Sequence, residues 1–71
     1  MEATLTFTTL KMAEDFAKAW SRKSMKGHII GCGAENVSVM INGITDELKI
    51  WIDMYVANIN KVVYLYQVNN N

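Results

Sequence analysis

Residues 36–59 change their hydrophobic period once, from that of a strand to that of a helix, and this change constrains the fold most. Val37, Val39 and Ile41 alternate with Ser38, Met40 and Asn42, the pattern of a strand with one buried face. Asn42-Gly43 ends the run, and Thr45, followed by two acidic residues, is the expected N-cap of a helix. Apolar residues then recur at helical spacing: Leu48, Trp51, Ile52, Tyr55 and Ile59.

The residues before this stretch predict a strand, a helix and a second, shorter strand. Apolar residues alternate with threonine in residues 3–7, and Thr8 or Thr9 can cap the helix that follows. The apolar side of that helix has five members: Met12, Ala13, Phe16, Ala17 and Trp20. Residues 28–33 then form a strand weakened by two glycines, and residues 34–36 connect it to the next strand as a hairpin. Residues 62–68 predict a last strand.

The predicted element order is β-α-β-β-α-β, in a single domain of residues 1–71. The commonest compact arrangement of this order is an α+β, ferredoxin-like sandwich, in which an antiparallel sheet carries two helices on one face. We expect the first and third strands in the centre of the sheet because their alternation is the cleanest. We also expect Trp51 to contribute most to the core, so that Trp51→Ala is the most destabilising single substitution.

Composition excludes several classes of protein. Seven basic and seven acidic side chains cancel, which argues against a protein whose whole surface binds nucleic acid. Cys32 is the only cysteine, so no internal disulfide and no cysteine cage for zinc can form. No apolar run approaches the roughly 20 residues of a membrane span, and residues 1–4 do not resemble the start of a signal peptide. We therefore expect a cytoplasmic protein without a membrane partner.

The second predicted helix has more apolar residues than one sheet requires. Three of them follow the spacing i, i+4, i+7 on a separate side of the helix: Ile50, Met54 and Ala57. One interpretation is that the first helix and the last residues of the chain cover them. The other is that they form an exposed strip that binds a protein partner or a second copy of the chain, since methionine suits adaptable interfaces.

Four basic side chains lie between positions 18 and 26, with no acidic residue among them: Lys18, Arg22, Lys23 and Lys26. Such a cluster could hold a phosphate or an RNA backbone, although solvated lysines are also common at helix ends. Tyr64 and Tyr66 could stack on bases if they face away from the helices. The central strands lack the aromatic residues of an RNA recognition motif. An RNA- or tRNA-binding regulator is therefore the alternative to a protein-binding module.

No set of residues specifies catalysis, a metal or a cofactor. His28 and Cys32 are two potential metal ligands without a third or fourth. Residues four apart on a strand lie about 13 Å from each other, too far for a nucleophile and its base. Asp46 and Glu47 serve to start a helix. We expect no catalytic residues, no metal site, no cofactor and no small-molecule substrate.

Three segments resemble the pterin-4a-carbinolamine dehydratase family in layout: residues 12–20, Gly27-His28 and residues 36–56. The family has a helix with A-x-x-F spacing, a two-stranded stretch, and a G-[LI]-T-x-[DE] sequence before its second helix, which Gly43-Ile44-Thr45-Asp46-Glu47 matches. The resemblance implies an α-β-β-α geometry and a tendency to dimerise. The family's activity depends on a histidine cluster, whereas this chain has His28 alone, so a dehydratase-like activity around His28 is only a third hypothesis.

The proline-free, charge-balanced chain of 71 residues is also similar to small accessory proteins that tailed phages use to redirect host machinery. This resemblance implies a protein that binds a host protein or an RNA. The prediction that we carry forward is a non-enzymatic protein-interaction module, such as a host-takeover or anti-defence factor. It would act through Ile50, Met54 and Ala57 or through an exposed sheet edge.

Overall fold

A computed structural model describes residues 1–59 and, for the backbone alone, residues 62–69. Strands and helices follow in this order: β1 (Glu2–Phe7), α1 (Leu10–Ser24), β2 (Ile29–Cys32), β3 (Val37–Ile41), α2 (Asp46–Ala57) and β4 (Val62–Asn69). Neighbouring strands pair antiparallel. The small antiparallel sheet with two helices confirms the predicted α+β class.

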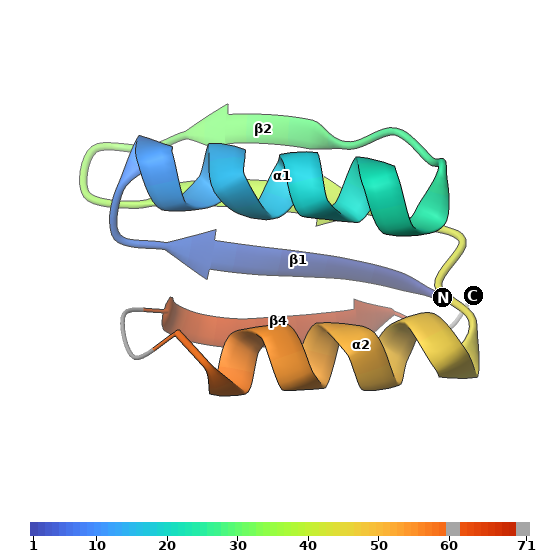
Figure 1. The fold of residues 1–71 in the computed structure, drawn as a ribbon. Coiled ribbons are helices and arrows are strands. Elements are labelled where there is room, and N and C mark those ends of the chain that lie inside the picture. Colours follow the sequence, from blue (N-terminus) through green and yellow to red (C-terminus); the bar gives the residue numbers. More distant parts are fainter. Residues whose placement is uncertain (60–61, 70–71) are drawn as a thin grey trace.

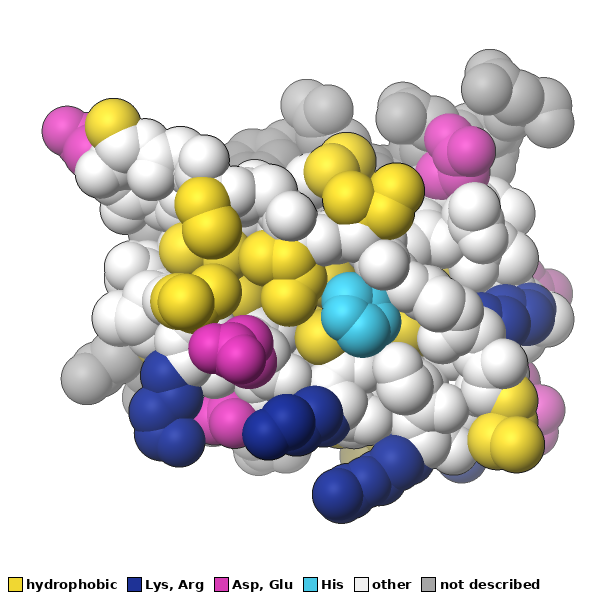
Figure 2. Space-filling model, turned by 90° about the horizontal axis from the view of Figure 1, so that it is seen from above, with side chains coloured by type: hydrophobic (Ala, Val, Ile, Leu, Met, Phe, Trp, Pro, Cys, Tyr) yellow, Lys and Arg dark blue, Asp and Glu magenta, His cyan; other side chains and the backbone are white. Residues whose placement is uncertain are grey.

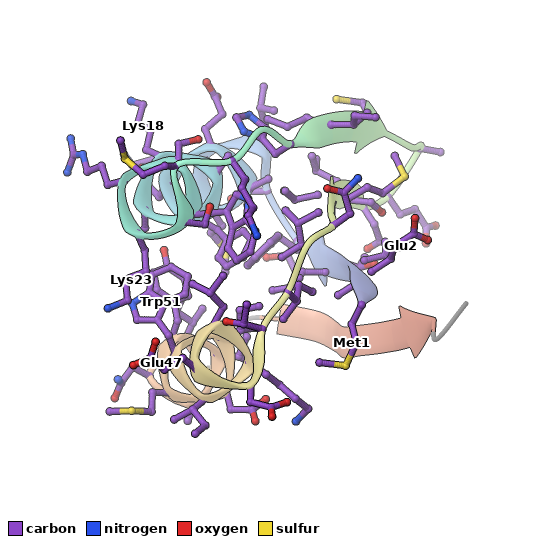
Figure 3. The ribbon with its side chains drawn as sticks, turned by 90° about the vertical axis from the view of Figure 1, so that its right-hand side faces the viewer. Met1, Glu2, Lys18, Lys23, Glu47 and Trp51 are labelled. Atoms are coloured by element: carbon purple, nitrogen blue, oxygen red, sulfur yellow. The ribbon has the colours of Figure 1, made fainter. Side chains whose placement is uncertain are left out.

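The sheet has the strand order β2-β3-β1-β4, which places β3 and β1 in its middle. The register between these two strands sets apolar residues opposite apolar residues: Ala3 with Ile41, Leu5 with Val39, and Phe7 with Val37. Both helices lie over the same face of the sheet, α1 over β1 and β3 and α2 on the side of β4 (Figure 1). The side view separates a helix layer from a strand layer (Figure 3). The core lies between these layers.

The centre of the core is Trp20 rather than Trp51. The largest fully buried side chains are Trp20, Phe7, Phe16, Leu5, Ile52 and Val39. Trp51 is half-buried and packs against the margin of this group. The expectation that Trp51→Ala is the most damaging substitution is therefore revised. Helical spacing identifies the buried side of each helix, but it does not tell which of two tryptophans the sheet will cover.

Aromatic rings join the two helices. The ring centroid of Phe16 lies 5.2 Å from that of Tyr55 and 6.1 Å from that of Trp51. Trp51 also lies 6.4 Å from Trp20. Tilted and edge-on ring pairs each contribute about 0.5–1.5 kcal/mol beyond the burial of their area. These contacts hold the side of α2 that carries Trp51 and Tyr55 against α1.

Both helices begin at a threonine that caps the first turn. Thr9 Oγ1 accepts a hydrogen bond from the backbone N–H of Met12 at 3.2 Å. Thr45 Oγ1 accepts one from the backbone N–H of Leu48, also at 3.2 Å. The structure therefore selects Thr9 over Thr8 as the first cap and confirms Thr45 as the second.

Gly43 forms the connection between β3 and α2 in a left-handed backbone conformation, with φ +69°. A side chain at this position would be strained, which explains why the predicted strand breaks at a glycine. The Gly43 carbonyl accepts a hydrogen bond from Lys26 Nζ. Lys26 is thereby directed from the end of α1 toward the start of α2.

Tyr55 makes the stability of the fold decrease at alkaline pH. Burial raises the pKa of the Tyr55 hydroxyl, and the Asp15 carboxylate raises it further. The folded state therefore holds this proton more tightly than the unfolded state, whose tyrosine pKa is about 10. This contribution to stability is complete below about pH 10 and is lost as the pH rises through the folded-state pKa.

We predict that the free energy of unfolding falls above about pH 10 and that Tyr55→Phe reduces this fall. The substitution keeps the ring that contacts Phe16 and Trp51 and removes only the titrating group. Urea denaturation at a series of pH values measures the effect. The same alkaline loss in wild type and variant would contradict the prediction.

Candidate functional site

The outer side of α2 carries an exposed apolar surface, which we call the α2 strip and define as Ile50, Met54 and Ala57. The side chains of Ile50 and Met54 lie one turn apart and are 61% and 62% exposed. Ala57 is exposed about one turn further along. Ile52 and Val56 of the same helix are buried in the core. The described parts of α1 and of the sheet therefore leave the α2 strip uncovered.

Acidic side chains border the α2 strip. Asp46 and Glu47 occupy the first turn of α2 and are exposed, and Glu47 is seen on this helix in Figure 3. Asp53 forms an ion pair with Lys49, with 3.1 Å between Nζ and Oδ2. Lys49 is the single basic residue of α2 beside three carboxylates, so α2 itself carries a net negative charge.

The four basic residues considered for RNA binding lie in three different places. Lys18 and Arg22 lie one turn apart on the side of α1 that faces β2. Lys23 projects from another side of α1, beside Trp51 (Figure 3). Lys26 donates its hydrogen bond to Gly43. The structure thus brings Lys18 and Arg22 together and separates both from Lys23 and Lys26.

The face of the sheet opposite the helices is the second surface considered for nucleic acid. It carries Thr6 and Ser38, whose hydroxyl oxygens lie 3.4 Å apart, and the partly exposed Met40. The backbone register sets Tyr64 opposite Thr6. The side chains of Tyr64 and Tyr66 lie outside the described residues. Within residues 1–59, this face has no aromatic side chain on which a base could stack.

A groove of about 450 Å³ lies between α1 and β2, and we call it the α1–β2 groove. Its lining consists of Glu14, Ala17, Lys18, Ser21, Arg22, His28 and Ile30. Figure 2 looks onto this side of the molecule, where hydrophobic side chains form a band next to the histidine, with acidic and basic side chains along one border. No local sequence pattern marks this groove, because its two walls come from segments that meet only when β2 folds back along α1.

Among the described residues, no group of three or more His, Cys, Asp or Glu side chains is placed to hold a metal ion. Cys32 is an exposed thiol on β2, and His28 Nδ1 lies 3.4 Å from Ser21 Oγ. No helix in the described ranges, 1–59 and 62–69, is long and apolar enough to cross a membrane.

Comparison of the chain with protein-family models, with curated proteins and with solved structures finds no match. The α2 strip combines exposed apolar side chains with an acidic border. The α1–β2 groove combines an apolar floor with basic side chains.

Proposed function

We propose that this protein is a non-enzymatic protein-interaction module that binds a helical segment of another protein through the α2 strip. One observation carries the proposal: Ile50 and Met54 are 61% and 62% exposed at successive turns of one helix. Burying such side chains against a partner gains about 25 cal/mol per Å² of apolar area. Together with Ala57 they form the i, i+4, i+7 ridge that one helix presents to another.

The charges around the α2 strip favour one class of partner. Asp46 and Glu47 lie in the first turn of α2, while Asp53 is paired with Lys49. Two α2 helices packed against each other would add the net negative charge of both, which is unfavourable. A partner helix with lysine or arginine beside an apolar ridge would pair with Asp46 and Glu47 instead. We therefore propose a basic amphipathic helix as the partner rather than a second copy of this chain.

We also propose the ferredoxin-like β-α-β-β-α-β sandwich as the fold that supports this surface. The antiparallel strand order β2-β3-β1-β4 and the position of both helices over one face favour it. In this arrangement Ile52 and Val56 anchor α2 in the core while its opposite side stays exposed. A helix that is already ordered loses little conformational freedom on binding, which favours affinity.

A selection from a library of helical peptides tests the proposed function. All members share an apolar ridge, and the positions beside the ridge are randomised among lysine, glutamate and serine. We predict that the wild-type protein enriches lysine at these positions because its own border is acidic. The variant with Ile50→Ser and Met54→Ser should enrich no sequence. Enrichment of glutamate, or the same enrichment by both proteins, would overturn the proposal.

A further inference from the structure

We propose that the α1–β2 groove binds an extended acidic segment of another protein, which adds a strand to the free edge of β2. This site is separate from the α2 strip and does not depend on the function proposed for it. β2 pairs with β3 on one side, and no strand within residues 1–59 and 62–69 lies on its other side. An edge strand offers a row of backbone N–H and C=O groups to a further strand.

The position of α1 leaves room beside this edge. α1 packs mainly over β1 and β3, and the groove of about 450 Å³ lies between α1 and β2. A strand added to β2 would lie about 4.8 Å from it, with alternate side chains pointing toward the helix layer. Ala17 and Ile30 would contact these side chains and supply an apolar floor for them. On the opposite face of the added strand, Ile29 offers a further apolar side chain that is 64% exposed.

The charges of the groove favour carboxylates on the ligand. Lys18 and Arg22 rise from successive turns of α1 and line the groove together with His28, which precedes β2. An arginine can hold a carboxylate through two parallel hydrogen bonds. Among the lining residues Glu14 alone is acidic, and it lies one turn before Lys18, away from the Arg22 end. Figure 2 shows the histidine beside the hydrophobic band, with both acidic and basic side chains along the border of the band.

The same charges argue against a second copy of this chain in the groove. Two β2 strands paired edge to edge would bring Lys18 and Arg22 of both copies close together, which is unfavourable. β2 has four residues, so it can form only a few backbone hydrogen bonds with an added strand. Carboxylates that reach Lys18 and Arg22 would supply the remaining affinity. The ligand that fits is an extended segment with alternating apolar and acidic residues.

Fluorescence anisotropy with labelled peptides tests this proposal. The probe is a peptide of alternating valine and glutamate. One control peptide alternates valine and lysine, and the other has the probe sequence with every backbone nitrogen methylated, so that it cannot donate hydrogen bonds to a strand edge. We expect the protein to bind the probe at least about tenfold more tightly than either control. Equal binding of either control would overturn the proposal.

Charge-reversed variants locate the site. The variant with Lys18→Glu and Arg22→Glu should bind the probe at least about tenfold more weakly. Lys23→Glu, on another side of α1, is the matched control and should change the affinity less than about twofold. The variant with Ile50→Ser and Met54→Ser should bind the probe as wild type does. Unchanged binding by the groove variant, or a loss of binding in either control variant, would overturn the proposal. Tight binding of single-stranded RNA through Lys18 and Arg22 would also overturn it.

Discussion

Replacing Trp20 by alanine is expected to lower the free energy of unfolding by about 3–5 kcal/mol. Trp20 is completely buried, and its Nε1–H donates a hydrogen bond to the Gly27 carbonyl at 3.1 Å. The substitution leaves a cavity between α1 and the sheet and removes the donor to that carbonyl. A chain of 71 residues has a total stability of roughly 4–11 kcal/mol, so the loss is a large share of it. Urea denaturation followed by far-ultraviolet circular dichroism measures the change.

Trp51→Ala is the matched comparison because it removes the same side chain from a half-buried position. We expect it to cost less, about 1–2 kcal/mol, since part of its surface is already exposed before the substitution. Trp20→Phe should fall between the two alanine variants, because it refills part of the cavity but cannot donate to Gly27. A larger loss for Trp51→Ala than for Trp20→Ala would show that Trp20 is not the centre of the core.

Replacing Ile50 and Met54 together by serine is expected to raise the Kd for a lysine-flanked helical peptide at least about thirtyfold, or ~2 kcal/mol. Both side chains are exposed in the free protein, so their apolar area is removed from water only in the complex. The substitution should therefore act on binding and change the free energy of unfolding by less than about 0.5 kcal/mol. Isothermal titration calorimetry gives the Kd, and urea denaturation gives the stability.

Ile29→Ser is the matched control for this loss of binding. Ile29 is 64% exposed, nearly the same as Ile50, but it lies on β2 at the opposite edge of the sheet from β4. We expect Ile29→Ser to leave the Kd for the helical peptide unchanged. An equal rise in Kd for Ile29→Ser would show that the peptide contacts exposed apolar side chains without preference for α2.

Local patterns predict the elements of this fold because their causes are local. The alternation of Val37, Val39 and Ile41 marks a strand with one buried face, and the structure buries all three. Thr45 caps α2 through a hydrogen bond to a residue three positions away. Asn42-Gly43 separates strand from helix because Gly43 adopts a left-handed conformation. None of these features depends on a distant part of the chain.

Features that depend on distant segments could not be predicted in the same way. Whether Trp20 or Trp51 lies in the centre depends on which helix sits over the middle of the sheet. Lys18 and Lys23 are close in sequence, but a helix turns them toward different sides, and the direction of Lys26 depends on Gly43. The α1–β2 groove forms only because β2 lies alongside α1 in the folded chain. No residue pattern within either segment predicts that the two segments lie side by side.

The sequence leaves two alternatives for the α2 strip: other parts of the chain cover it, or it is exposed. The spacing of Ile50, Met54 and Ala57 shows that they share one side of a helix. A helix side with this composition can be covered by another element or left open, and the choice depends on how α1 and α2 lie over the sheet. The aromatic contacts of Phe16 and Trp51 place α1 against another side of α2, which leaves the strip open.

Backbone amide chemical shifts, recorded while a lysine-flanked helical peptide is titrated into the protein, test the proposed contact most directly. Binding through the α2 strip predicts that the largest shifts fall on Ile50, Met54, Ala57 and the acidic residues beside them, and that the amides of β2 do not shift. Largest shifts on β2 or on the open face of the sheet would contradict it, as would a titration in which no amide of α2 shifts.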